Sequence, residues 1–167
     1  DLYTLEPTSE LLDLTDGSTE AVYPQVAWNQ DHYVVAWYDR SAFGTNAIYA
    51  TTISADGQMI VPPTAVTSPG PYRSRDPQIL PLGDRALIVY ADDRDDEIAG
   101  YELYSRMIGT DLAPLGAEQR LTDAPGDSIS PVAAFGPDGD LGILYRDNPA
   151  GEQHVWFTRL GCVVASP

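Results

Sequence analysis

The sequence contains no lysine, and its nine arginines stand against 25 aspartates and glutamates. The formal net charge is −16, and a chain this acidic repels nucleic acid and anionic membrane surfaces at long range. We therefore expect no nucleic-acid partner. Adaptation to salt or simple solubility would explain the acidity equally well. Cations and neutral or basic partners, including a glycan or another protein, remain open.

Cysteine and histidine are almost absent. Cys162 is the single cysteine, and His32 and His154 are the two histidines, so the chain has no internal disulfide and no thiol cluster for zinc. Neither histidine neighbours a nucleophile motif such as G-x-S-x-G, and no Gly-rich phosphate loop precedes a helix. The sequence thus indicates no catalytic residue. Whether Cys162 is buried or paired with another chain stays open.

Long hydrophobic runs are also missing. No stretch of eighteen apolar residues occurs, so we expect no membrane insertion. The chain begins at Asp1, as processed chains do. We expect a secreted or cell-surface bacterial protein whose leader has already been removed.

No segment keeps a helical period for three turns. Instead, short runs of β-branched and aromatic residues alternate with turns formed from 14 prolines and 14 glycines spread along the chain. With 43% hydrophobic residues there is enough apolar material for one core. The pattern predicts a single all-β domain over residues 1–167.

One stretch recurs three times and sets the period of the chain. It reads VVAWYDR at 34–40, LIVYADDR at 87–94 and GILYRDN at 142–148, which places Asp39, Asp92 and Asp147 at spacings of 53 and 55 residues. A period in this range is typical of repeat proteins. A proline opens the strand before each copy, at positions 24, 77 and 131, where it removes no ladder hydrogen bond.

Each repeat can be divided into four strands. The repeats cover about 24–67, 77–122 and 131–167, and the last of them has no Leu-Thr ending to form a fourth strand. Residues 11–15, LLDLT, resemble that missing strand, because Leu14 precedes Pro24 by ten residues as Leu121 precedes Pro131. We therefore expect a fourth strand displaced to the front of the chain.

Four-stranded units of about fifty residues with a W-x-D-x-R-like second strand resemble the blades of bacterial secreted β-propellers, broadly of the sialidase type with Asp-box-like turns. Asn148 replaces the arginine found at Arg40 and Arg94, and the turn at 54–57 lacks the tryptophan of a full Asp-box. Propellers close with roughly four to eight blades. The resemblance thus implies three blades, half of a six-bladed ring that a homodimer or the remainder of a longer propeller completes.

Candidate ligand-binding residues follow from the repeated aromatic-x-Asp pattern. If they point into one cleft, they would bind a cation or sugar hydroxyls; alternatively, each aspartate caps a turn or pairs with an arginine, and we favour this second interpretation. The candidates are Trp37, Asp39, Arg40, Tyr90, Asp92, Arg94, Tyr145 and Asp147.

The densest acidic stretch offers a calcium hypothesis, because carboxylates are the hard ligands calcium prefers. Its acids are Asp92, Asp93, Asp95, Asp96 and Glu97. The stretch lacks the spacing and central glycine of an EF-hand, and a solvated loop is the alternative we favour.

On function, the sequence favours a non-enzymatic propeller module that binds carbohydrate, protein or calcium. The alternative is a sialidase-like or other glycoside hydrolase, which needs a pair of carboxylates. Asymmetry between blades separates the two, since a hydrolase needs unlike residues in unlike roles.

Overall fold

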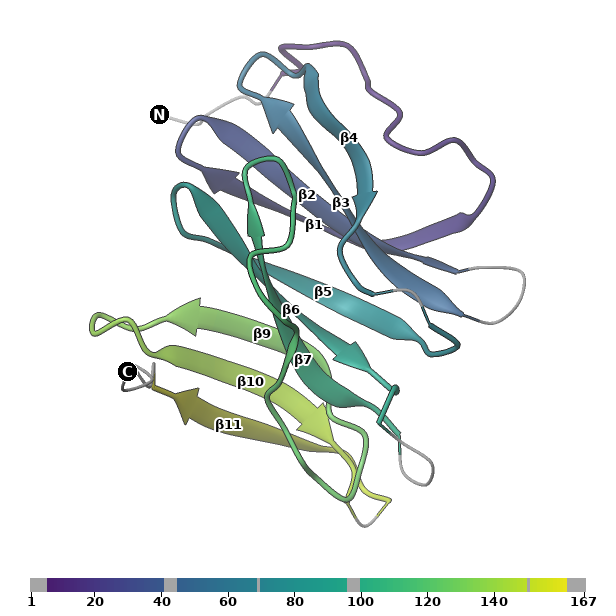
Figure 1. Cartoon of the computed structure of the whole chain (residues 1–167), viewed down its shortest axis with the longest axis vertical. Helices are drawn as coiled ribbons and strands as arrows, with labels where there is room; N and C mark the ends of the chain where they lie inside the picture. The colour runs from purple at the N-terminus through teal and green to yellow at the C-terminus, as the bar shows by residue number, and fades with distance from the viewer. Residues whose placement is uncertain (1–5, 41–44, 69, 96–99, 150, 162–167) are drawn as a thin grey trace.

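The computed structural model describes residues 6–40, 45–68, 70–95, 100–149 and 151–161. These residues form eleven β-strands in three antiparallel sheets (Figure 1). No helix occurs among them, so no helical segment in the described residues could cross a bilayer. The predicted all-β fold is confirmed.

Blades 1 and 2 each contain four strands in chain order. The strands of blade 1 are β1 (Glu20–Asn29), β2 (His32–Arg40), β3 (Asn46–Ser54) and β4 (Met59–Ala65). Those of blade 2 are β5 (Ser74–Pro81), β6 (Arg85–Asp92), β7 (Glu102–Gly109) and β8 (Gln119–Arg120). The repeated apolar stretches are thus β2 and β6, the second strand of their blades, as predicted.

Blade 3 has three strands in the described residues: β9 (Ile129–Phe135), β10 (Leu141–Asp147) and β11 (His154–Leu160). The first strands of the blades, β1, β5 and β9, lie next to one another, because β5 contacts both β1 and β9. The later strands fan outward from this inner row, as propeller blades do (Figure 1).

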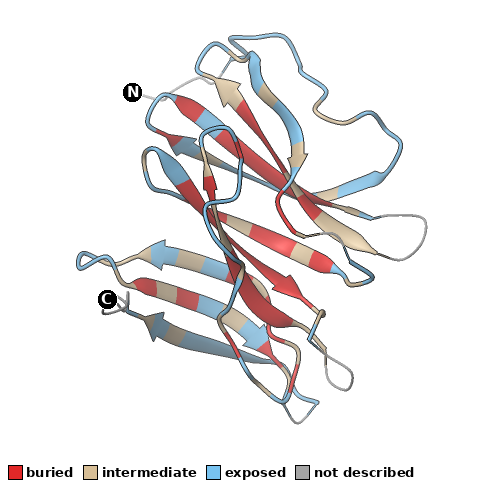
Figure 2. Ribbon diagram, viewed as in Figure 1, coloured by how far each residue is buried: buried red, intermediate tan, exposed pale blue. Residues whose placement is uncertain are grey.

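The core lies between the blades. One apolar cluster joins blades 1 and 2 through side chains such as Val34, Tyr38, Ile79 and Ile88. A second joins blades 2 and 3 and includes Ile143. Buried residues therefore concentrate on β2, β5, β6 and β7, whereas β4 and β11 are largely exposed (Figure 2).

Residues 11–15, predicted as a fourth strand displaced to the front, form no strand within this single chain, and their pairing with a last blade stays a prediction. Leu11 is fully exposed, and the backbone N–H of Thr15 donates to the carboxylate of Asp13 at 3.0 Å. The segment runs over blade 1, where Leu11 lines a hollow with Tyr33 and Ile53.

Candidate functional site

The inner strand of every blade carries the same backbone irregularity. Tyr23, Asp76 and Ser130 have φ angles of 53°, 53° and 54°, and each stands directly before the proline that the sequence repeats. The ladders skip at these points, as β-bulges do. A left-handed conformation at a non-glycine residue costs on the order of 1–3 kcal/mol and tends to gather at functional sites. The bulges are therefore the first place to look for a site.

The three bulge positions share a backbone conformation but carry different side chains: a tyrosine, a carboxylate and a hydroxyl. Tyr23 is more than half exposed and stacks on Tyr38 with ring centroids 5.6 Å apart. Asp76 is buried, and its Oδ2 accepts hydrogen bonds of 3.2 Å from both the backbone N–H and the hydroxyl of Ser130. Asp76 thus ties blade 2 to blade 3 beside the inner row.

Asp76 keeps one oxygen unused. Its Oδ1 is buried and accepts no hydrogen bond, although Oδ2 also forms a 3.2 Å ion pair with Nε of Arg75. Leaving a buried charged oxygen without a donor costs about 1–3 kcal/mol or more. Such an atom calls for an explanation, such as strain, a bound water or ion, or a catalytic role; Oδ1 of Asp140 and Oδ1 of Asp147 share this state.

A cationic and aromatic group surrounds this carboxylate. The guanidinium groups of Arg75 and Arg73 lie 5.4 and 5.3 Å from the ring centroid of Tyr101. Burial works against the charge of Arg75, but the Asp76 carboxylate outweighs it and raises the pKa of Arg75. Burial also raises the pKa of Tyr101, whose hydroxyl stays protonated at neutral pH. The group offers a carboxylate, hydrogen-bond donors and an aromatic face, the chemistry that recognises sugar hydroxyls.

The repeated aspartates occupy a different place, at the ends of the second strands. Asp92 and Asp147 are buried and accept hydrogen bonds from the hydroxyls of Ser74 and Ser128, at 2.6 and 3.0 Å. Each of these aspartates thereby holds the start of the inner strand in its own blade. Asp39 instead accepts from the Trp37 indole at 2.9 Å, since Ala21 is the residue that faces it in the ladder.

The other candidates from this pattern also bond within their blades. Arg40 forms a long ion pair with Glu20 at 3.3 Å, and Tyr145 faces blade 2 from β10. Trp37 and Asp39 line a groove of about 480 Å³ beneath residues 13–19, whereas Asp92 lines a separate hollow in blade 2. The structure gathers them into no single cleft within the described residues, and ligand binding by them stays a prediction.

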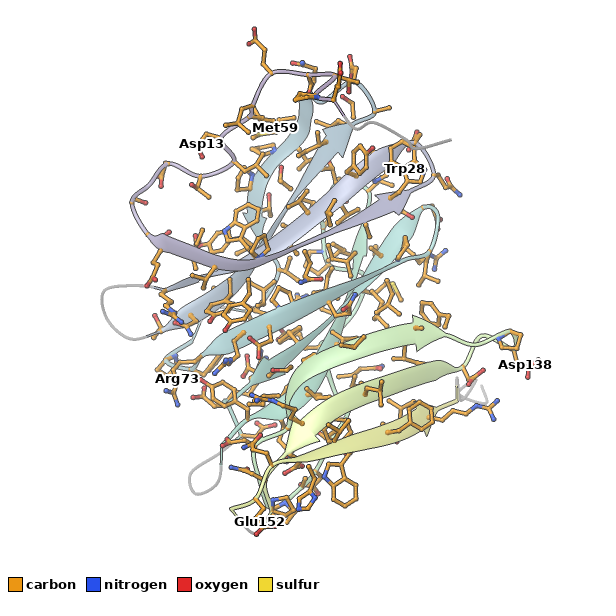
Figure 3. The ribbon with its side chains drawn as sticks, turned by 180° about the vertical axis from the view of Figure 1, so that it is seen from behind. Asp13, Trp28, Met59, Arg73, Asp138 and Glu152 are labelled. Atoms are coloured by element: carbon orange, nitrogen blue, oxygen red, sulfur yellow. The ribbon has the colours of Figure 1, made fainter. Side chains whose placement is uncertain are left out.

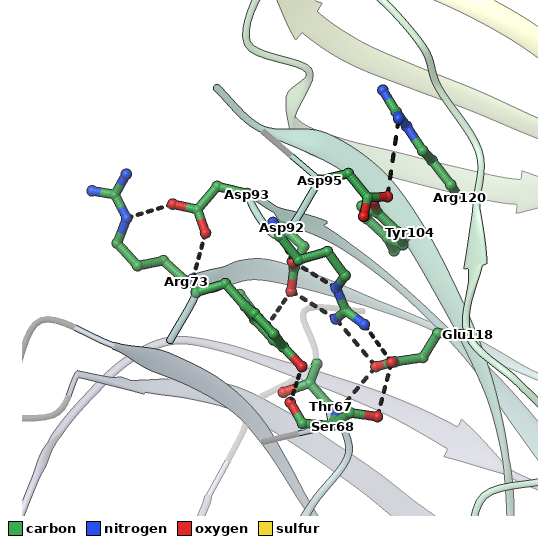
Figure 4. A network of polar contacts seen from close by, with 12 residues as sticks. Thr67, Ser68, Arg73, Asp92, Asp93, Asp95, Tyr104, Glu118 and Arg120 are labelled. Carbon is green, nitrogen blue, oxygen red and sulfur yellow. Dashed lines mark hydrogen bonds and ion pairs between the residues drawn. The ribbon is translucent and has the colours of Figure 1, made fainter. Parts of the chain in front are cut away.

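A polar network around Glu118, drawn in Figure 4, links blade 2 to Ser68 in the loop after β4, and Arg94 and Tyr90 belong to it. Arg94 forms two 2.8 Å contacts with Asp92, bonds the carboxylate of Glu118 and lies 4.6 Å from the Tyr72 ring centroid. Tyr90 donates to Glu118 at 2.7 Å. The pairing of an aspartate with the neighbouring arginine, which we favoured from the sequence, is present here.

Glu118 is the centre of this network. Its carboxylate also accepts bonds from the backbone and hydroxyl of Ser68, in the loop after β4, and forms a 3.2 Å ion pair with Arg106. Burial alone would raise the pKa of Glu118, but the bonds from Arg94 and Tyr90 outweigh it and lower that pKa from 4.5 to about 2. Sequence reasoning missed Glu118 because it lies outside the repeated motif.

The described acids of the stretch proposed to bind calcium each bond to a different side chain. Asp92 binds Arg94, Asp93 binds Arg73 at 2.7 Å, and Asp95 binds the hydroxyl of Tyr104. No group of three acids, histidines or cysteines suited to a metal ion occurs in the part of the chain that the structure describes. Asp96, Glu97 and also Cys162 lie outside the described residues, and calcium binding stays a prediction.

Comparison with known proteins gives a fold and no family. No protein-family model and no curated protein matches the chain. Solved structures do, and they are glycoside hydrolases. The endo-arabinase of Bacteroides thetaiotaomicron matches with a TM-score of 0.65 at 17% identity, over 89% of this chain and 60% of that one.

Two further structures give the same result. A thermostable family-43 glycoside hydrolase matches with a TM-score of 0.62 at 13% identity, over 83% of this chain and 50% of that one. The α-L-arabinanase of Penicillium chrysogenum, solved with arabinobiose, matches with a TM-score of 0.59 at 18% identity, over 92% and 49%. The chain has the fold of these β-propellers and spans about half to three-fifths of their length.

These neighbours correct two expectations. The prediction of a non-enzymatic binding or scaffold module is wrong, because the solved structures that the chain resembles are hydrolases. They support the alternative prediction of a glycoside hydrolase. The narrower sialidase-type resemblance gains no support, since two of these neighbours are named an endo-arabinase and an α-L-arabinanase and no family model matches. The repeated motif did not distinguish these two functions, because it reflects the packing between blades, which binding modules and enzymes share.

Proposed function

We propose that the chain provides three blades of a β-propeller glycoside hydrolase, with Asp76 as a carboxylate at its substrate-binding face. The observation that carries the proposal is the asymmetry at the bulges. Only Asp76 brings an acid to the three inner-strand positions, and its Oδ1 has no partner within the described structure. Unlike residues on a shared backbone are what an enzyme site requires.

Asp76 suits a role in acid–base or electrostatic catalysis. Glycoside hydrolysis uses two carboxyl groups that flank the scissile bond, and their separation sets the stereochemical outcome. Ser130 and Arg75 hold Oδ2, and Oδ1 has no donor in the described residues but is buried, so that in this proposal the groups around it move to admit a substrate hydroxyl or an attacking water. The second carboxyl group belongs, in this proposal, to the blades that complete the ring.

The substrate class we propose is a pentose-containing glycan such as arabinan. The neighbours named as arabinanases and an arabinofuranosidase support this choice. Tyr101, whose ring contacts the Arg75 that pairs with Asp76, provides an aromatic surface for a sugar ring. A polymeric glycan is also a substrate consistent with the export expected from the sequence.

The test is hydrolysis of arabinan and of 4-nitrophenyl α-L-arabinofuranoside, by reducing-sugar and chromogenic assays. We expect Asp76→Asn to lower kcat by about 10²–10⁴-fold, the range for a positioned acid or base. Asp84→Asn, at the exposed turn between β5 and β6, is the matched control and should leave kcat unchanged. Absence of turnover in the wild type on a panel of glycosides, or equal activity of the two variants, would refute the proposal.

A further inference from the structure

Both ends of the three-blade stack present a blade face that no other blade of the described chain covers, although residues 7–16 lie over part of the outward face of blade 1, where they line hollows with Tyr33, Ile53 and Trp37. The face of blade 3 that points away from blade 2 carries Val132, Leu144 and Phe157 in one cross-strand row. Leu144 is 45% exposed and Phe157 is 66% exposed. An apolar row of this kind on a sheet face indicates a contact surface.

The repeat shows what such a face packs against. The positions of Leu144 in blades 1 and 2 are Ala36 and Val89, which lie three residues before the repeated aspartate, and both are fully buried against the following blade. The position of Phe157 in blade 1 is Ala50, which is fully buried as well. The outward face of blade 3 therefore continues the interface already present between successive blades.

The other end of the stack shows the complementary face. Val26 of blade 1 is 65% exposed, whereas its counterpart Ile79 in blade 2 is buried against blade 1. Trp28 and Tyr33 pack edge to face beside it, in a row that extends across the sheet to Met59 (Figure 3). Within the described residues, no blade packs before blade 1 and none packs after blade 3.

The hydrogen bonds at the strand edges support the same conclusion. In blade 1, Thr67 accepts the N–H of Ile48 on its hydroxyl, and Val66 donates to the Ile48 carbonyl at 2.7 Å. In blade 2, Thr122 and Leu121 make the same two bonds with Leu103.

The corresponding residue of blade 3 is Val155, one position before Trp156 as Ile48 is before Tyr49. Val155 is 73% exposed, whereas Ile48 and Leu103 are fully buried. The outer edge of β11 pairs with no strand of the described chain. An unpaired edge of this kind is a template for another strand.

We propose that a second copy of this chain closes the ring, with its Leu14 and Thr15 pairing with Val155. Leu14-Thr15 has the apolar-Thr pattern of Val66-Thr67 and Leu121-Thr122, and it stands before the first blade. Two copies related by a twofold axis bring each open face against its complement and give six blades, within the range at which propellers close. This inference concerns assembly and does not rest on the proposed hydrolase activity.

Light scattering on a sizing column tests the proposal with the full chain. We expect a particle of twice 18.1 kDa. Leu144→Asp places a charge on the face of blade 3 and should shift the mass to 18.1 kDa. Leu115→Asp replaces an equally exposed leucine in the loop before β8 and should leave the dimer intact.

A disulfide cross-link tests the register of the proposed strand. In a Cys162→Ser background, Leu14→Cys combined with Val155→Cys should give a covalent dimer on oxidation. Asp56→Cys at an exposed turn, combined with Val155→Cys, should not. A wild-type mass of 18.1 kDa or of three or more chains would overturn the two-copy ring, and equal cross-linking of the two pairs would overturn the pairing.

Discussion

Glu118 gives the sharpest stability prediction. Its carboxylate receives bonds from Tyr90, Ser68 and Arg94 and pairs with Arg106, so Glu118→Gln removes the negative charge that neutralises two buried cations. A pKa lowered from 4.5 to about 2 corresponds to about 3 kcal/mol of folding free energy. We therefore expect the variant to lose about 3 kcal/mol of unfolding free energy at pH 7.

The loss should depend on pH in a definite direction. Because the folded-state pKa is below the unfolded one, the stabilisation is present above pH 4.5 and disappears as the pH falls through about 2. The difference between wild type and Glu118→Gln should thus shrink from about 3 kcal/mol at pH 7 to below about 1 kcal/mol at pH 2. Comparison with the variant cancels the other carboxylates that titrate in the same range.

Urea unfolding followed by tryptophan fluorescence, at one fixed protein concentration, measures this difference. Glu152→Gln, at an exposed turn in blade 3, is the matched control and should change stability by no more than about 0.5 kcal/mol. Equal effects of the two substitutions, or a Glu118→Gln effect that stays constant from pH 7 to pH 2, would show that the network does not stabilise the fold.

Three further predictions concern packing, the strand ties and calcium. Ile88→Ala empties a fully buried position between blades 1 and 2 and should cost about 2–5 kcal/mol in urea unfolding; a cost below that of an exposed substitution would contradict the core described above. Ser74→Ala removes a hydroxyl from the buried Asp92 and should cost about 1–3 kcal/mol, with Ser18→Ala in the exposed segment before β1 as control. If the acidic stretch at 92–97 binds calcium, the ion should raise Tm and a chelator should lower it, and no shift in either direction would remove that hypothesis.

The sequence predicted the features of this fold that repeat. The aromatic-x-Asp pattern located the second strands, and prolines 24, 77 and 131 located the inner strands, because every blade needs the same backbone and the same packed face. The prolines do not open these strands as predicted, since β1, β5 and β9 begin two to four residues earlier and each proline follows the bulge inside its strand. The serines that hydrogen-bond to Asp92 and Asp147 also occupy a repeated position in the sequence. Ser74 and Ser128 stand three residues before their prolines, where blade 1 has Ala21.

Features that occur once were harder to predict. Glu118 reaches its partners through the folded contact between two blades, and no local pattern marks it. Asp76 was visible as a difference at a repeated position, since Tyr23 and Ser130 precede the other two prolines. Its significance, however, depends on the left-handed backbone and the unpaired oxygen that the structure supplies. Residues 11–15 form no strand within the single chain, and their pairing with a second copy stays a prediction.

If the ring is twofold, the position of Asp76 at the bulge of β5 affects how many ligands bind per chain. Asp76 of one copy and Asp76 of the other would then face each other across the central axis, in identical surroundings. A ligand that lies on this axis would have the same surroundings from both copies, and a calorimetric titration would reach its end point at one ligand for every two chains. The ring, and not the single chain, would be the binding unit.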